Sequence, residues 1–238
     1  MRPRRPHAGF TLLELLVVIV LIAALSVAFI GGIGQGRSVA LQAGQSAVSN
    51  LIAAARSRAM ANGNPTRLLV NQQLPATVTT GPARYLRYLA LQEQDGVDSS
   101  GKPKWKTVAD VYLPDGVYVL PNAAPARPFF APPDPWVTVR LTALQSQALS
   151  PAASLVSDTV NSANAETWAV LNFTADGKPT PPVPAPPTTE SLSIVLTVGR
   201  ALPPGGASPF VFENAENVRG LVLGNYGVPI LVNDRSGF

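Results

Sequence analysis

The chain has 238 residues and a formal net charge of +4, with a single histidine and no cysteine. The lack of cysteine excludes disulfide bonds and thiolate metal sites. A hydrophobic content of 46% is enough for a folded core, while 24 prolines and 19 glycines indicate many turns and loops. We therefore expect one globular domain in addition to any N-terminal targeting or membrane segment.

The N-terminal residues combine a basic start with a long apolar run. Residues 1–9 contain arginines and no acid, and residues 10–33 are almost all Leu, Val, Ile, Ala, Phe and Gly. This run is longer than the roughly 20 residues that cross a bilayer as a helix. Basic residues beside the first apolar segment favour the cytoplasmic side. The sequence predicts a single-pass protein whose N-terminus is cytoplasmic and whose remaining residues lie across the membrane.

Glu14 is the only ionised residue within the apolar run. A carboxylate at the centre of a membrane helix costs about 2.5 to 3.5 kcal/mol on insertion scales, and less near an end. A charge in such a place is by default functional and needs a partner of opposite charge. Glu14 is therefore the first candidate functional residue.

The segment from Gly9 through Phe10 to Glu14, with the basic residues before it, resembles the leader junction of type IV prepilins and type II secretion pseudopilins. The resemblance implies that prepilin peptidase cuts between Gly9 and Phe10 and that the new amino group of Phe10 is methylated. It also implies that Glu14 pairs with the terminal amine of a neighbouring pilin or pseudopilin subunit. The protein would start in the inner membrane with a periplasmic head and then enter a filament. The alternative is a simple membrane-anchored periplasmic protein.

Residues 34–62 are predicted to continue as an amphipathic helix that reaches into the head. Polar residues such as Gln42, Gln45 and Arg56 lie off the apolar stripe. The glycine cluster at 31–36 predicts either a weakened helix or a small-residue packing surface. Asn62 and Gly63, followed by Pro65, predict the end of the helix. The stripe that we expect to face the head consists of Ala40, Ala43, Ala47, Leu51, Ala55 and Ala59.

Residues 63–238 are predicted to form a β-rich head, because short runs of β-branched and aromatic residues alternate with turn signals. The fold class is α+β, with a long N-terminal helix packed on a C-terminal antiparallel sheet, as in pilins. The proline-rich segments 121–135 and 179–187 are expected to be surface loops. The strands are expected at 66–70, 85–92, 105–112, 117–120, 136–141, 167–173, 191–198, 220–223 and 228–232. The turns are expected at Asp95-Gly96, Ser100-Gly101, Asp115-Gly116, Asp176-Gly177 and 224–227, the last within a terminal hairpin.

Three head segments, 54–65, 171–179 and 218–223, resemble the H-type minor pseudopilins and the related FimT-like minor pilins. This resemblance implies a minor, non-enzymatic filament subunit. The two proline-rich segments depart from the family pattern, so the order of the strands in the sheet stays open. Whether the machine is a secretion system, a pilus or a DNA-uptake device also stays open.

Enzymatic activity is disfavoured by the residues themselves. The only histidine, His7, lies in the predicted leader, so the mature chain would have neither Ser-His nor Cys-His chemistry nor histidine-bound zinc. The acids beyond the helix are scattered through predicted turns, where they are solvated. Segment 93–101 offers oxygen ligands for calcium but lacks EF-hand spacing, and a polar hairpin loop explains it better. We predict no catalytic residue, no metal site and no cofactor.

Nucleic-acid binding is the second alternative, because the resemblance includes pilins associated with DNA uptake. The residues that could form a basic patch across one hairpin are Arg84, Arg87, Lys102, Lys104 and Lys106. Basic and acidic residues are nearly balanced beyond residue 63, however, and phosphate binding needs a concentrated positive surface. The sequence therefore disfavours a nucleic-acid partner.

Overall fold

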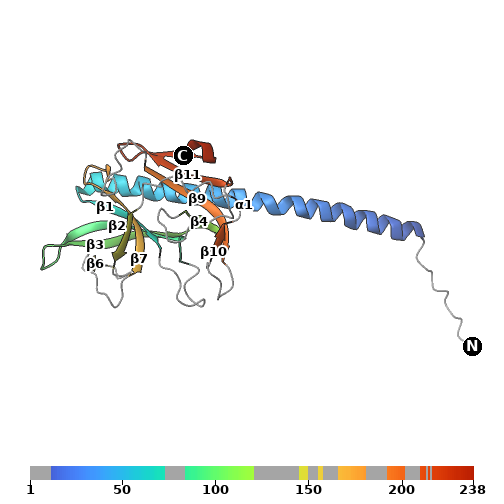
Figure 1. The fold of residues 1–238 in the computed structure, drawn as a ribbon, viewed down its shortest axis with the longest axis horizontal. Helices are drawn as coiled ribbons and strands as arrows, with labels where there is room; N and C mark the ends of the chain where they lie inside the picture. Colours follow the sequence, from blue (N-terminus) through green and yellow to red (C-terminus); the bar gives the residue numbers. More distant parts are fainter. Residues whose placement is uncertain are drawn as a thin grey trace, which may run out of the picture. The chain divides into compact units, whose positions relative to one another are not determined.

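The computed structural model describes residues 12–72, 84–120, 145–149, 155–157, 166–180, 192–201, 210–212, 214 and 216–238 (Figure 1). The chain divides into two compact units, Met1–Val39 and Ala40–Phe238. Helix α1 (Leu12–Asn62) contributes residues to both units. The second unit contains every strand.

Helix α1 is continuous through the glycine cluster at 31–36, so the helix is not melted there, and whether it is weakened stays a prediction. The helix ends where the sequence predicted. Gly63 adopts a φ of 66°, and its N–H donates to the carbonyl oxygen of Ala59 at 2.9 Å. A glycine in the left-handed region directly after the last helical residue is a common helix stop.

The described strands form two antiparallel sheets. The first has the order β5-β7-β1-β2-β3-β6, with β8 also paired to β7, and the second has the order β10-β9-β11-β12, with β4 also paired to β9. In the first sheet the strands are β1 (Thr66–Asn71), β2 (Tyr88–Val97), β3 (Pro103–Tyr112), β5 (Gln145–Leu149), β6 (Leu155–Ser157), β7 (Glu166–Phe173) and β8 (Pro179–Thr180). In the second they are β4 (Val117–Val119), β9 (Leu192–Ala201), β10 (Phe210–Phe212), β11 (Val218–Leu223) and β12 (Pro229–Val232), and a 3-10 helix, η1 (Arg235–Gly237), follows them.

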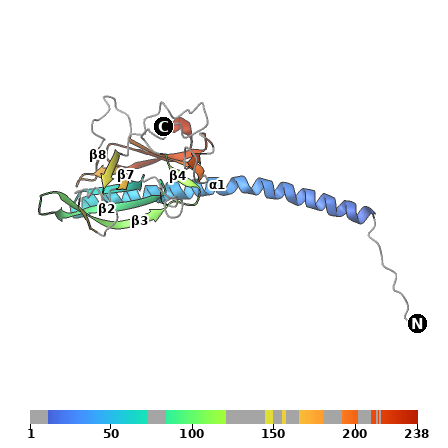
Figure 2. The same cartoon turned by 60° about the horizontal axis from the view of Figure 1, so that its bottom comes forward.

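These elements confirm the α+β class and the antiparallel head, although the head has two sheets where one was expected. The terminal hairpin is confirmed as β11 and β12. Figure 2 shows β2 and β3 side by side as one long hairpin. The predicted strand at 136–141 and the loop at 121–135 lie outside the described residues. The loop predicted at 179–187 begins with β8, and the rest of it also lies outside.

Two boundaries near β2 were wrong for local reasons. The predicted strand at 85–92 begins only at Tyr88, because residues 84–87 form a turn in which Leu86 has a φ of 54°. Its neighbours hold it there, since Leu86 N–H donates to Asn71 and Leu86 C=O accepts from Val119. Gly96 lies inside β2 at an irregularity in the register, and the hairpin turn follows near Gly101.

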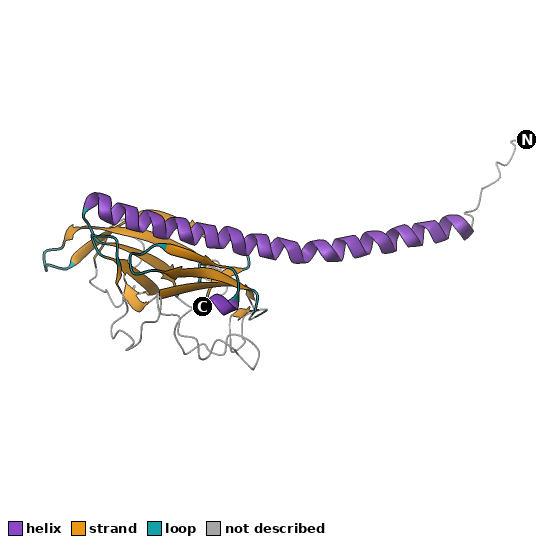
Figure 3. Ribbon diagram, turned by 90° about the horizontal axis from the view of Figure 1, so that it is seen from above, coloured by secondary structure: helices purple, strands orange, loops and turns teal. Residues whose placement is uncertain are grey.

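The largest core cluster joins α1 to both sheets. Figure 3 shows the last part of α1 running along one face of the strands. The fully buried residues that α1 contributes to this cluster include Leu41, Val48 and Ile52. Leu68, Leu91 and Leu171 join it from the first sheet, and Leu196, Val198 and Leu221 join it from the second.

The buried face of α1 differs from the predicted stripe in its first half. Leu51, Ala55 and Ala59 are buried as expected, but Ala43 is exposed and Ala40 and Ala47 are only half-buried. The buried positions are instead Leu41, Gly44, Gln45 and Val48. Adjacent helical residues point about 100° apart, so a shift of one residue in the inward direction exchanges these two sets. In this first half Leu41 and Val48 fill the core, and Ala40 and Ala47 lie at its margin.

Gln45 was assigned to the polar side of the helix, and this was wrong. Its side chain is 2% exposed, and its amide nitrogen donates to the carbonyl oxygens of Gly220 at 2.7 Å and Val232 at 2.8 Å. Gly220 and Val232 face each other across β11 and β12. A single side chain on α1 therefore binds both strands of the terminal hairpin.

We expect Gly220→Ala to destabilise the head by about 3 kcal/mol, because a core without spare volume responds to added atoms by straining its backbone. A β-carbon at residue 220 would lie 2.1 Å from the carbonyl oxygen of Ile194 and 2.8 Å from the ring of Phe238. The measurement is chemical unfolding of the full chain in mild detergent. Gly224→Ala is the control, because its β-carbon would lie 3.9 Å from the nearest atom outside its chain neighbours, the Val228 oxygen. The control should change stability by no more than about 0.5 kcal/mol. Equal effects of the two substitutions would contradict the packing at Gly220.

Candidate functional site

The predicted processing and assembly residues lie at the start of the chain. Gly9 and Phe10 lie outside the described residues, and Glu14 is part of α1 with a side chain that also lies outside them. The structure therefore brings none of these side chains to a described partner, and their roles stay predictions.

The part of α1 that follows Glu14 is apolar on all sides. Each residue from Leu15 to Ile22 has between 46% and 59% of its surface exposed. Consecutive helical residues point around the whole circumference, and a helix that is hydrophobic all round is typical of a segment buried in a larger assembly or a membrane. Within the described part of the chain, no helix satisfies the length and apolarity required to cross a membrane.

The structure places Arg84 in a cluster of aromatic and acidic side chains. Its guanidinium lies 4.8 Å from the ring centre of Tyr88 and 5.9 Å from that of Trp168. A nitrogen of Arg84 lies 3.7 Å from a carboxylate oxygen of Glu166. Burial, and secondly Asp110, raise the pKa of Tyr88. The aromatic rings and the carboxylate therefore already engage the charge of Arg84.

Arg87 is also engaged within the head. Its side chain is 13% exposed and forms an ion pair with Asp115 at 2.5 Å. It also donates to the carbonyl oxygen of Leu113 at 3.0 Å and lies 5.9 Å from the ring centre of Tyr118. These contacts join the turn before β2 to the loop between β3 and β4. Arg87 has the environment of a structural residue.

The three lysines lie at the opposite end of the β2–β3 hairpin. Lys102, Lys104 and Lys106 are exposed on and beside β3. The register pairs Tyr88 with Tyr112 at the arginine end and Gln94 with Trp105 at the lysine end. The structure thus brings the lysines together but separates them from Arg84 and Arg87. The five residues do not form one patch.

In the oxygen-rich loop between β2 and β3, the carboxylate of Asp98 holds the turn in place. A carboxylate oxygen of Asp98 accepts the N–H of Ser100 at 2.8 Å and that of Lys102 at 2.9 Å. These bonds are typical of an Asx turn. Within the described part of the chain, no group of three or more His, Cys, Asp or Glu residues is placed to hold a metal ion.

A second turn, between β7 and β8, is closed by backbone hydrogen bonds from Gly177 N–H to Thr174 C=O at 2.8 Å and from Thr174 N–H to Lys178 C=O at 2.9 Å, and an exposed ion pair lies beside it. Lys178 lies 2.7 Å from Asp176, and hydrogen bonds from Lys178 and Thr174 lower the pKa of the Asp176 carboxyl to about 2. Gly177, at the centre of the turn, has a φ of 75°. The predicted turn at Asp176-Gly177 is confirmed.

One exposed apolar surface was not identified by the sequence reasoning. In and beside β12, Tyr226 is 68% exposed, Ile230 58% and Leu231 53%. This surface could have been predicted from the sequence, because residues 220–233 contain no charged residue and a solvated hairpin normally carries some.

The comparisons with known proteins bear on the N-terminal segment. Residues 4–30 match the model of the prokaryotic N-terminal methylation motif. The chain carries a type IV prepilin-like signal. This confirms the prepilin-like resemblance for the segment that contains Gly9, Phe10 and Glu14. The match ends at residue 30, so the H-type resemblance of the head stays a prediction. No curated protein and no solved structure matches the chain.

If Arg87 in the prepilin-like chain is structural, Arg87→Ala should lower the free energy of unfolding by about 1 to 3 kcal/mol. The physical reason is that the part-buried carbonyl of Leu113 loses its donor. Lys104→Ala, an exposed basic residue of the same hairpin, serves as the matched control and should stay within about 0.5 kcal/mol of the parent. Thermal or chemical unfolding of the full chain in mild detergent measures both. A stability unchanged by Arg87→Ala would return that residue to the list of candidate binding groups.

Proposed function

We propose that the protein is a non-enzymatic minor pilin or pseudopilin of the H-type, cleaved between Gly9 and Phe10 and assembled into a type II secretion pseudopilus or a type IV pilus-like filament. The observation that carries the proposal is the methylation-motif match at residues 4–30. The match includes the cleavage position and Glu14. Its partners are then prepilin peptidase, the membrane and other pilin-like subunits.

In this proposal residues 1–9 are the leader and residues 10–33 anchor the precursor in the inner membrane. The basic leader stays in the cytoplasm, while the amphipathic segment 34–62 and the head at 63–238 lie in the periplasm. Cleavage and methylation at Phe10 precede extraction into the filament. The apolar residues from Leu15 to Ile22, exposed in the single chain, support burial by lipid first and by neighbouring helices afterwards.

Glu14 has a specific role in this assembly. In a layer of low dielectric, a carboxylate and a terminal ammonium attract strongly, and each offsets the cost of burying the other. Apolar burial of the helices gives cohesion without fixing how far one helix slides along another. A single charge pair adds that information, because only one register brings Glu14 to the Phe10 amine of a neighbour.

The H-type assignment rests on the resemblance of three segments, and the structure shows where these segments lie in the head. Two of the three resembling segments, 54–65 and 171–179, meet in space: a β-carbon at Gly177 would lie 2.9 Å from Met60 and 3.0 Å from Arg56. The third segment forms β11, which contributes Leu221 and Leu223 to the core shared with α1. The likeness therefore falls on residues that hold the helix end to both sheets.

The first test is the mature N-terminus, measured by intact mass and N-terminal sequencing of protein from membranes that contain prepilin peptidase. We expect a chain that begins at Phe10, with an added methyl group. Gly9→Trp should leave the leader attached, because the peptidase must accommodate this residue at the scissile bond, whereas Ala24→Trp, within the apolar run, should still be cleaved. A parent chain that begins at Met1, or a Gly9→Trp chain cut before Phe10, would refute the processing step.

A separate test concerns Glu14. Glu14→Ala should still insert and be cleaved but should enter filaments at least about tenfold less, since about 1.4 kcal/mol of lost pairing already gives a factor of ten. Glu14→Asp keeps the charge and should recover part of the incorporation, while Glu14→Gln should not. The measurement is the ratio of filament-bound to membrane-bound subunit. Normal incorporation of Glu14→Ala would exclude the charge pair.

A further inference from the structure

Two stretches of the head lack charged residues although parts of both are exposed. Residues 38–55 of α1 and residues 220–233 of the terminal hairpin contain no Asp, Glu, Lys or Arg. Gln45 joins them, because its amide binds Gly220 and Val232. Gln42, one helical turn before Gln45, is exposed beside this contact. Depletion of charge is typical of the core of a protein–protein interface.

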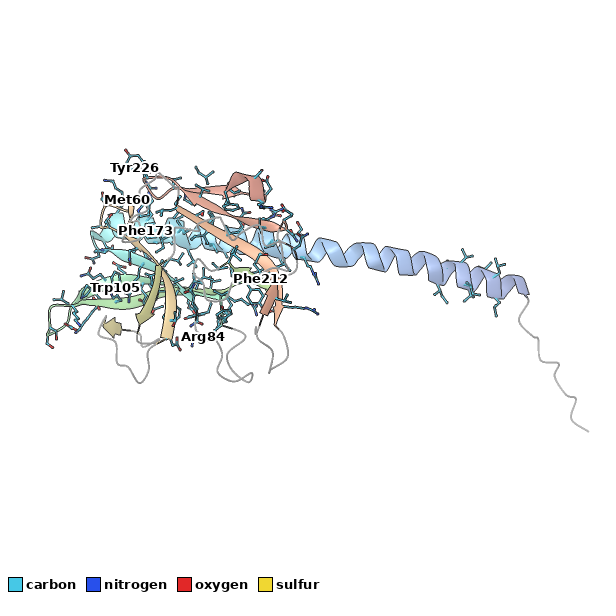
Figure 4. All side chains as sticks on the ribbon, viewed as in Figure 1. Met60, Arg84, Trp105, Phe173, Phe212 and Tyr226 are labelled. Carbon is cyan, nitrogen blue, oxygen red and sulfur yellow. The ribbon has the colours of Figure 1, made fainter. Side chains whose placement is uncertain are left out.

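The exposed apolar residues gather on the same hairpin. Tyr226, Ile230 and Leu231 are each more than half exposed. Figure 4 shows Tyr226 beside Met60 at the end of α1, and the contacts agree: Gly177 lies against Met60, and a β-carbon at Gly227 would lie 2.8 Å from the carbonyl oxygen of Gly177. Met60 is itself 48% exposed. The apolar surface extends from the tip of the hairpin along β12.

The outer edge of β12 presents backbone groups as well as side chains. β12 is the last strand in the order β10-β9-β11-β12, so among the described residues no strand pairs with its outer edge. Gly224 N–H donates to Val228 C=O, which makes this pair a hydrogen-bonded one. Antiparallel pairs alternate, so Ile230 and Val232 bond toward β11, whereas the N–H and C=O of Leu231 point outward. The C=O of Pro229 points the same way.

Two of the usual protections of an edge strand, a charge and a bulge, are absent from β12, although the strand is only 4 residues long and begins with a proline. Natural edges carry a charge, a bulge or a proline where a foreign strand would pair. β12 has no charged residue, its register with β11 is regular, and its proline stands at position 229, where only the first outward N–H is lost. Leu231 keeps its outward donor and acceptor, and its side chain and that of Ile230 stand exposed on opposite faces of the strand.

We propose that the outer edge of β12 docks an extended, uncharged segment of another protein subunit, which adds to the second sheet as a further strand. The N–H and C=O of Leu231 and the C=O of Pro229 supply the hydrogen bonds. Ile230 and Leu231 contact alternate side chains of the added strand on its two faces. The part of the occupant that faces Ile230 and Leu231 has no charges, because residues 220–233 offer none to pair with them, and Arg219 and Asp234 only flank the hairpin. This contact lies in the head, goes beyond the helix-based assembly described above, and does not depend on Glu14.

The test introduces p-benzoylphenylalanine, a photo-crosslinking residue, in place of Ile230 or of Leu231 in the full chain. The chain is expressed in cells that contain its assembly machinery. Both positions should crosslink to one short segment of one partner, at sites within about three residues of each other, because both faces of one added strand are sampled. Val97, an exposed apolar residue of β2 at 58%, is the control position. Crosslinks to lipid, to helix α1 of a second copy or to scattered sites would overturn the proposal, as would yields no higher than those from position 97.

A second measurement separates strand addition from contact through side chains alone. Amide hydrogen exchange at Leu231 should slow at least about tenfold in the assembled complex relative to the purified chain, since its outward N–H gains an acceptor. The inward amide of Ile230 is bonded to β11 in both states and should change little. Leu231→Lys, which adds an edge charge, should reduce crosslinking from position 230 about tenfold, whereas Val97→Lys should not. An unchanged exchange rate of the Leu231 amide in the complex would refute strand addition. Failure of this proposal would leave the processing and Glu14 tests unaffected.

Discussion

Burial of one face of α1 is the constraint on which the head depends. Among the described residues, the two sheets form separate ladders, and the core cluster that they share is centred on the helix. Leu41, Val48 and Ile52 have no exposed surface, and full burial of such a side chain contributes about 1.5 to 3 kcal/mol. Without this face the inner residues of both sheets would lie open to water. Both sheets therefore contribute residues to the core that covers this face of the helix.

Helix α1 has two kinds of surface. Its first part is apolar on all sides, and its last part buries one face in the head. From Leu15 to Ile22 every direction is apolar, which suits surroundings that are apolar on all sides. From Leu41 onward the fully buried apolar side chains lie on one face, and Gln42, Ser46 and Asn50 are exposed on the other side. A helix with one apolar face packs in one orientation against a folded domain. A helix that is apolar on all sides can be buried in lipid or among other helices in many orientations, so in the proposed filament Glu14 has to fix the position of the helix relative to its neighbours.

Much of the fold was predictable because it depends on local signals. The helix end at Gly63, the turns at Gly101, Gly116 and Gly177 and the terminal hairpin all rest on glycines with positive φ at positions that the sequence marks clearly. The missed strands had no such signal. β6 and β10 are three residues long, and β5 contains two glutamines and a serine, so none shows the period of a strand. The prediction of the buried helix face was wrong in its first half because alanine occurs both at the margin of a core and inside it. The helix sequence alone therefore does not show which residues face the second sheet.

Gln45 connects the stability of the head to the surface that it presents. An apolar residue at this position could fill the same volume, but it could not distinguish one position of the hairpin from another. The amide nitrogen binds the carbonyl oxygens of Gly220 and Val232, which belong to paired residues on neighbouring strands, so both strands must stand in register with the helix. Buried polar groups are known to fix register in this way at some cost in stability. Because β12 is held from its inner side by Gln45 and β11, its outer edge keeps one geometry with its backbone groups directed away from the head, as strand addition requires.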